Sequence, residues 1–89
     1  MPRKLLLISA FILLFAGPVH ADRDVAISDL PATVIESIMK EYPNAKIINA
    51  EEDSKAGVKY YEIKIEDGNT RREIHIRPGG TIFKQKIEN

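Results

Sequence analysis

Residues 58–76, VKYYEIKIEDGNTRREIHI, decide the fold, because two alternating runs flank the turn-forming residues 67–70, DGNT. Alternation on both sides of such a turn predicts a β-hairpin. One face of the hairpin carries Tyr61, Ile63, Ile65, Ile74 and Ile76. The opposite face carries Tyr60, Glu62, Lys64, Glu73 and His75. We expect the apolar face to form the core and the polar face to meet solvent.

Cross-strand charges indicate the register of this hairpin. A two-residue loop at Asp67-Gly68 would place Glu62 opposite Glu73 and Lys64 opposite Arg71, and both pairs repel. A four-residue loop, residues 67–70, replaces these contacts with favourable ones. We therefore predict the pairs Glu66–Arg71, Lys64–Glu73, Glu62–His75, Ile63–Ile74 and Tyr61–Ile76.

The remaining elements surround the hairpin. A helix is expected to start at Pro31 and to end at or before Tyr42, because Pro43 cannot continue it. Strands are expected at residues 46–53, 58–66, 71–77 and 81–87, with turns at 54–57, 67–70 and 78–80. Short connections favour a meander. The prediction is an α+β domain, in which one N-terminal helix packs on a four-stranded antiparallel β-meander.

The core follows from the helical period and the strand registers. A Pro78-Gly79 loop would turn Phe83 inward and Ile82 outward. The hairpin formed by residues 46–53 and 58–66 would leave Ile47 outward. A core this small supplies roughly 3–5 kcal/mol of stability. The predicted core is Val34, Ile35, Ile38, Met39, Tyr42, Ile48, Ala50, Tyr61, Ile63, Ile65, Ile74, Ile76, Phe83 and Ile87.

Residues 1–21 have the pattern of a secretory signal peptide. Arg3 and Lys4 precede 12 apolar residues, 5–16, and Gly17-Pro18 leads to a cleavage site before Asp22. A retained membrane anchor is the alternative, but a span needs about 20 apolar residues. We predict a periplasmic or secreted protein with a flexible lead-in at 22–29 and one domain at 30–89.

The composition argues against several functions. Removing the two basic residues of the leader leaves 11 basic and 13 acidic residues, a net charge of −2, which does not favour nucleic acid. The chain has no cysteine.

His75 is the sole histidine after the leader, and we expect it to pair with Glu62. The run Glu51–Asp53 alternates across a strand and does not converge. We therefore expect no enzyme activity, no cofactor and no metal site.

Three stretches, DLPATVIESIMKEYPNAKI, KYYEIKIEDG and IHIRPGGTI, resemble the PepSY-like family of small exported bacterial domains, also described as having a β-lactamase-inhibitor-protein-like fold. The matching features are Leu30-Pro31, Tyr42-Pro43, Ala45, Tyr61-Glu62, Asp67-Gly68 and Gly80. The resemblance implies an envelope location and a role in binding or restraining other proteins, with peptidase inhibition the usual proposal. Members often carry an acidic residue where this chain has Arg77.

The uncovered sheet face is the expected binding surface for another envelope protein or peptide. An ordinary solvated sheet face is the simpler interpretation. The rival functions are a homo-oligomer joined through the edge strands 46–53 or 81–87, and a small-ligand sensor. One helix on a sheet leaves little room for a pocket of about 300 Å³. The candidate binding residues are Tyr60, Glu62, Lys64, Arg71, His75, Arg77 and Ile82.

Overall fold

The computed structural model describes residues 22–88, so the expected leader lies outside the described part of the chain. In chain order the elements are β1 (Arg23–Asp24), the 3-10 turn η2 (Ile27–Asp29), α1 (Ala32–Glu41), β2 (Lys46–Lys55), β3 (Val58–Asp67), β4 (Thr70–Ile76) and β5 (Ile82–Glu88). Neighbouring strands are antiparallel, and the strand order across the sheet follows the chain from β1 to β5.

The sheet has five strands, so the prediction of a four-stranded meander with an N-terminal helix is wrong. The additional strand, β1, lies in the segment expected to be a flexible lead-in. Arg23 lies opposite Glu52, and the Val25 amide donates to the Ala50 carbonyl oxygen at 2.9 Å. Two paired residues are too few to show an alternating pattern, which is why the sequence did not reveal this strand. Among the described residues, β1 and η2 therefore precede the helix.

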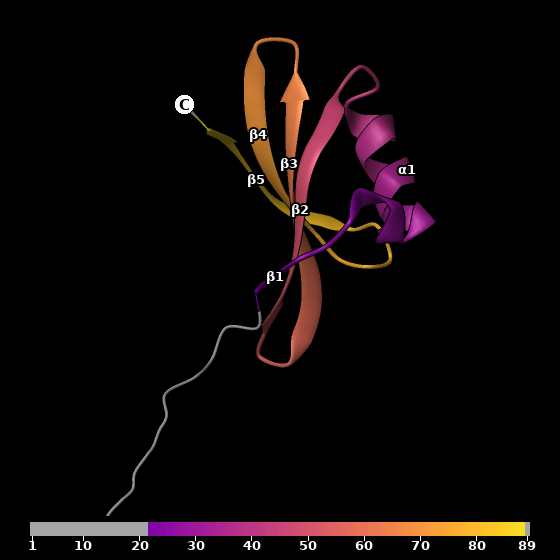
Figure 1. Cartoon of the computed structure of the whole chain (residues 1–89), viewed down its shortest axis with the longest axis vertical. Helices are drawn as coiled ribbons and strands as arrows, with labels where there is room; N and C mark the ends of the chain where they lie inside the picture. Colours follow the sequence, from indigo (N-terminus) through magenta and orange to yellow (C-terminus); the bar gives the residue numbers. More distant parts are fainter. Residues whose placement is uncertain (1–21, 89) are drawn as a thin grey trace, which may run out of the picture.

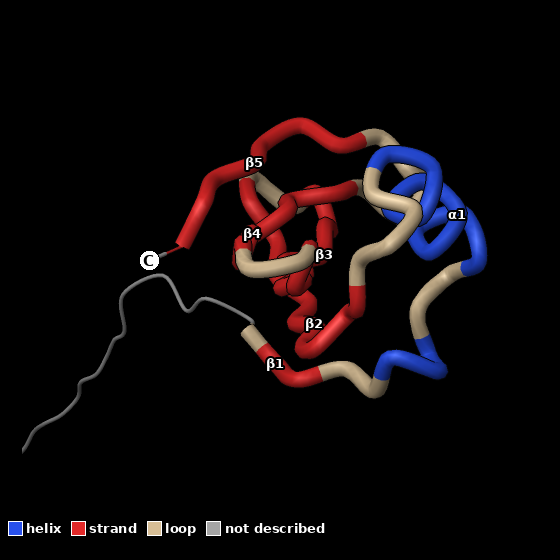
Figure 2. Tube along the Cα trace, turned by 90° about the horizontal axis from the view of Figure 1, so that it is seen from above, coloured by secondary structure: helices blue, strands red, loops and turns tan. Residues whose placement is uncertain are grey.

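Helix α1 covers one face of the sheet and leaves the other uncovered (Figure 1). Seen from above, the strands follow one another in an arc, with the helix on its inner side (Figure 2). The predicted helical stripe is confirmed, because Val34 and Ile38 are fully buried while Ile35, Met39 and Tyr42 pack partly buried against the core. The buried cluster is Leu30, Val34, Ile38, Ala50, Tyr61, Ile63, Ile65, Ile74 and Ile76.

The central hairpin has the predicted register. The predicted pairs, from Glu66–Arg71 to Tyr61–Ile76, are all confirmed between β3 and β4. Asp67 and Thr70 pair as well, so the ladder is one step longer than expected and only two residues form the loop. The predicted register is therefore correct, but the predicted four-residue loop is too long.

The pairing of β4 with β5 differs from the prediction. Ile76 lies opposite Ile82 and His75 opposite Lys84, so Phe83 is an extra residue at a β-bulge. As a result Ile82 packs against the core, whereas Phe83 is 43% exposed. The prediction had these two residues reversed. The predicted core position of Ile87 is also wrong, because that side chain is 57% exposed.

The pairing of β2 with β3 contains a second β-bulge. Ile47 pairs with Ile65 and Asn49 with Lys64, which leaves Ile48 as the extra residue. Ile47 packs against the core and Ile48 does not belong to it, the reverse of the prediction. Bulges exchange the faces of neighbouring apolar residues without changing the composition of a strand, so the sequence pattern did not reveal either one.

The turn between β4 and β5 fastens the helix to the sheet. Thr33 Oγ1 donates to the Pro78 carbonyl oxygen at 2.5 Å, and Ser37 Oγ donates to the Gly80 carbonyl oxygen at 2.6 Å. Gly80 has a φ of +98°, and a Cβ there would lie 2.8 Å from the Thr33 carbonyl oxygen. Glycine is required here for its conformation and for the close approach of α1.

Candidate functional site

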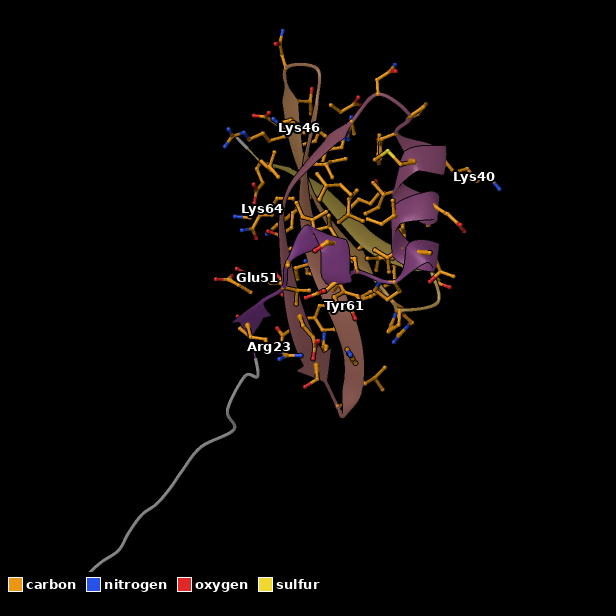
Figure 3. All side chains as sticks on the ribbon, turned by 45° about the vertical axis from the view of Figure 1, so that its right-hand side comes forward. Arg23, Lys40, Lys46, Glu51, Tyr61 and Lys64 are labelled. Atoms are coloured by element: carbon orange, nitrogen blue, oxygen red, sulfur yellow. The ribbon has the colours of Figure 1, made fainter. Side chains whose placement is uncertain are left out.

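The open face, meaning the side of the sheet opposite α1, holds most of the residues expected to bind a partner. Figure 3 shows Glu51 and Lys64 on the far side of the sheet from the helix, while Lys40 points outward from α1. Because side chains alternate along a strand, Tyr60 and Glu62 share the face of Lys64. The observed pairing adds Arg71 and His75 from β4. Ile82 is not on this face, because it packs against the core.

Three rings form an aromatic cluster on the open face: Tyr60, His75 and Phe83. The Tyr60 and His75 rings are stacked, with centroids 5.5 Å apart. The Phe83 ring meets them edge-on, at 5.4 Å from Tyr60 and 6.0 Å from His75. The Arg77 guanidinium lies 4.9 Å from the centroid of Phe83. The bulge in β5 brings Phe83 here, and Phe83 is therefore absent from the predicted site.

A groove of about 290 Å³ lies beside the aromatic cluster. It runs between the β2–β3 loop and the start of β5. A second hollow of about 250 Å³ lies near β1 and is lined by Arg23, Glu52 and Lys59 among others. The groove is lined by Lys55, Ala56, Val58, Tyr60, Arg77 and Phe83.

A carboxylate cluster adjoins the rings and comprises Asp53, Glu62 and Glu73. Glu73 Oε2 is 2.7 Å from His75 Nε2, and Glu62 Oε1 is 3.9 Å from the same nitrogen. The Tyr60 hydroxyl donates to Asp53 Oδ2 at 3.1 Å and lies 3.4 Å from Glu62 Oε2. Asp53 and Glu73 are buried although they lie on the uncovered side.

The predicted partner of His75 is thus correct for the backbone register but not for the closest side chain. Glu62 is the cross-strand neighbour, yet the hydrogen bond joins His75 to Glu73, two residues earlier on the same strand. Both side chains project to the same face because strand residues at i and i+2 do so. The spacing of Glu73 and His75 in the sequence is therefore a signal that could have identified Glu73 as a partner of His75.

The pKa values of the ionisable groups around the cluster are shifted in different directions. Burial, followed by the hydrogen bond to Asp53, raises the pKa of Tyr60 to about 12. Burial also raises the pKa of Glu62, while His75 opposes that change and the carboxylates of Glu73 and other acids reinforce it. The hydrogen bond from His75 lowers the pKa of Glu73. Neighbouring carboxylates therefore differ in how readily they accept a proton.

Lys64 and Arg71 lie in ion pairs near the other end of the face. Lys64 Nζ is 3.8 Å from Glu88 Oε2. Arg71 donates from Nε and Nη2 to Glu66 Oε2, at 3.1 and 2.9 Å. Of the predicted site residues, Tyr60, His75 and Arg77 contact Phe83, and Glu62 adjoins Tyr60 and His75. Lys64 and Arg71 belong to this separate group.

The chain is similar in fold to a solved DUF2874 family protein from Bacteroides uniformis ATCC 8492, with a TM-score of 0.66 and 17% sequence identity. The match covers 74% of this chain and 51% of that protein, so this chain matches about half of its neighbour's length. The likeness supports a small β-rich domain fold. No family model and no curated protein matches the chain. Within residues 22–88, no helix is long and apolar enough to cross a bilayer.

Proposed function

We propose that this protein is an exported, PepSY-like binding module that engages another protein of the cell envelope through its open face. The leader pattern at residues 1–21 supports export, and the motifs from Leu30-Pro31 to Gly80 support the PepSY-like relationship. In this proposal the bound protein is restrained or regulated, and a peptidase is the first class to test.

The aromatic cluster is the observation that carries the proposal. An uncovered sheet face with an ordinary solvated role needs only polar side chains, but here Phe83 stands 43% exposed against two other rings. Tyrosine and arginine are enriched among the residues that dominate binding energy. Tyr60 and Arg77, one residue of each type, both contact the Phe83 ring.

The groove beside the cluster indicates the chemistry of the partner. Val58 and Phe83 offer apolar surface, and the groove is also lined by Lys55 and Arg77. An apolar side chain next to a carboxylate would match this combination of apolar walls and basic groups. We therefore propose that the partner presents a short segment in which an aliphatic or aromatic residue neighbours an acidic one.

The test is a binding measurement with two matched variants. Partners are captured from the envelope with the parent protein and identified by mass spectrometry, and the dissociation constant of each purified partner is then measured. Phe83→Ala is expected to weaken binding at least tenfold, since central aromatic residues commonly contribute 2 kcal/mol or more. Ile87→Ala removes another exposed apolar side chain and is expected to leave binding unchanged. Equal affinities for the two variants would contradict the proposal.

Self-association through β5 is the second candidate. The arrangement of the sheet favours β5 as the joining edge, because β1 already covers part of β2. Exposed strand edges pair readily, although Lys84 and Lys86 on β5 oppose it. Light scattering at high concentration should then give a dimer. A monomer for the parent protein excludes this candidate.

A further inference from the structure

We propose that Glu62, Glu73 and His75 bind a divalent transition-metal ion such as Zn²⁺ on the open face. One ligand atom from each side chain lies within 4.8 Å of the other two. The inference concerns a site that needs no partner protein, so it is independent of the binding function proposed above.

The strand pairing prearranges the three side chains. His75 lies directly opposite Glu62, and Glu73 is two residues before His75 on the same face of β4. The side chains of Glu62, Glu73 and His75 are only 22%, 12% and 12% exposed, so their neighbours restrict their motion. Zinc–ligand bonds are about 2.0–2.2 Å long, so small side-chain shifts would place all three donors around one ion.

The donor types favour zinc and similar ions. An imidazole nitrogen with carboxylate oxygens suits Zn²⁺ and its neighbours, whereas Ca²⁺ and Mg²⁺ prefer sites made of oxygen alone. His75 Nε2 is the nitrogen that faces the carboxylates, at 2.7 Å from Glu73 and 3.9 Å from Glu62. A bound ion would take the place of the proton in the hydrogen bond between His75 and Glu73.

The charge around the three residues is suited to a cation. Carboxylate oxygens of Asp22, Asp53 and Glu73 each lie within 4.8 Å of one from Glu62, so negative charge is concentrated here. Lys86 Nζ lies 3.7 Å from Glu73 Oε2 and offsets part of this charge. A divalent ion would relieve the remaining repulsion. The open face leaves coordination positions for water, since α1 covers the other side of the sheet.

The Tyr60 hydroxyl adjoins one of the proposed ligands, Glu62. The Tyr60 hydroxyl lies 3.4 Å from Glu62 Oε2 and donates to Asp53 at 3.1 Å. Such partners commonly hold metal-binding side chains in position. The sequence alone predicted no metal site, because it contains one histidine after the leader and its acidic neighbours come together only through the pairing of β3 with β4.

Titration calorimetry with ZnCl₂ tests the site, on untagged protein produced from the full chain. We expect binding of one Zn²⁺ per chain, and no comparable heat with MgCl₂. Glu62→Gln and His75→Gln are each expected to weaken Zn²⁺ binding at least tenfold, as loss of a ligand requires. Glu66→Gln is the matched control, because Glu66 lies on the same strand and pairs with Arg71.

The ring signals of His75 in NMR spectra give a second readout. Zn²⁺ should shift them in the parent and in Glu66→Gln, and circular dichroism establishes that each variant is folded. Absence of Zn²⁺ binding by the parent overturns the proposal. Equal binding by Glu62→Gln and Glu66→Gln also overturns it, even if His75→Gln fails to fold. Neither result affects the proposed role of Phe83 in partner binding.

Discussion

At the residue scale, Gly80 sets how closely α1 approaches the β4–β5 turn. Its φ of +98° and the 2.8 Å between a Cβ there and the Thr33 carbonyl oxygen both disfavour any side chain. We expect Gly80→Ala to lower the free energy of unfolding by about 1–3 kcal/mol, the usual cost of local backbone strain. Urea denaturation measures this loss.

Two other glycines provide controls for that prediction. A Cβ at Gly79 meets nothing within 4 Å, and no positive φ occurs there. Gly68 has a φ of +64° but also has open space. Gly79→Ala should therefore be nearly neutral, and Gly68→Ala should cost less than Gly80→Ala. Equal losses at Gly68 and Gly80 would show that the contact with the helix is unimportant.

Glu52 provides a residue-scale prediction about pH. The hydrogen bond from Arg23, at 3.1 Å, is the main reason that the pKa of Glu52 lies below its ordinary value of 4.5. A lowered pKa means that the contribution to stability is present above 4.5 and is lost as the pH falls through the folded-state value. Acid should thus weaken the attachment of β1 to β2.

An NMR titration of the Glu52 carboxyl carbon checks this expectation. Arg23→Gln should move the pKa of Glu52 back toward 4.5. Arg71→Gln, which removes a partner of Glu66 instead, should leave the Glu52 titration unchanged. If Arg23→Gln does not change the titration, then β1 is not held by this ion pair.

At the scale of elements, the two bulges separate the strand pairings that the sequence predicts from those that it does not. The β3–β4 hairpin could be predicted because a shift in register would have opposed like charges such as Glu62 and Glu73. In β5, Ile82 and Phe83 are both apolar neighbours, so either one fits the inward position. The choice depends on how β5 meets the turn at Gly80, which a sequence pattern does not encode.

The corrected register of β5 predicts opposite outcomes for two adjacent substitutions. Ile82→Ala removes a side chain that packs against the core, so it should cost about 2 kcal/mol or more of unfolding free energy. Phe83→Ala removes a side chain that is 43% exposed and should cost less. Urea denaturation of both variants measures the two changes in unfolding free energy. A larger decrease for Phe83→Ala than for Ile82→Ala would contradict the observed register of β5.

The candidate site was only partly predictable for the same reason. Tyr60, Glu62 and His75 were placed correctly on the open face by their alternation along β3 and β4. Phe83 was missed because it reaches that face through a bulge. Glu73 lies on this face as predicted, but its hydrogen bond to His75 was not predicted, because cross-strand charge pairing indicated Glu62 as the partner.

At the scale of the whole molecule, one helix and one sheet share a single small core. A domain of this size has roughly 3–5 kcal/mol of stability. Ile63 is fully buried at the centre of the sheet, and Ile63→Ala should cost about 2–5 kcal/mol. We therefore expect this variant to be largely unfolded at 37 °C by circular dichroism. A parent-like melt would mean that the core extends beyond the cluster described above.

The central claim is that the open face around Phe83, and not the outer side of α1, meets a partner protein. Site-specific photo-cross-linking in cells that express the full chain tests it most directly. A photoreactive residue at position 83 should yield a covalent adduct with one envelope protein, and the same residue at position 40, on the outer side of the helix, should not (Figure 3). The adduct should persist with Glu66→Gln. An adduct from position 40 but none from position 83 would contradict the account.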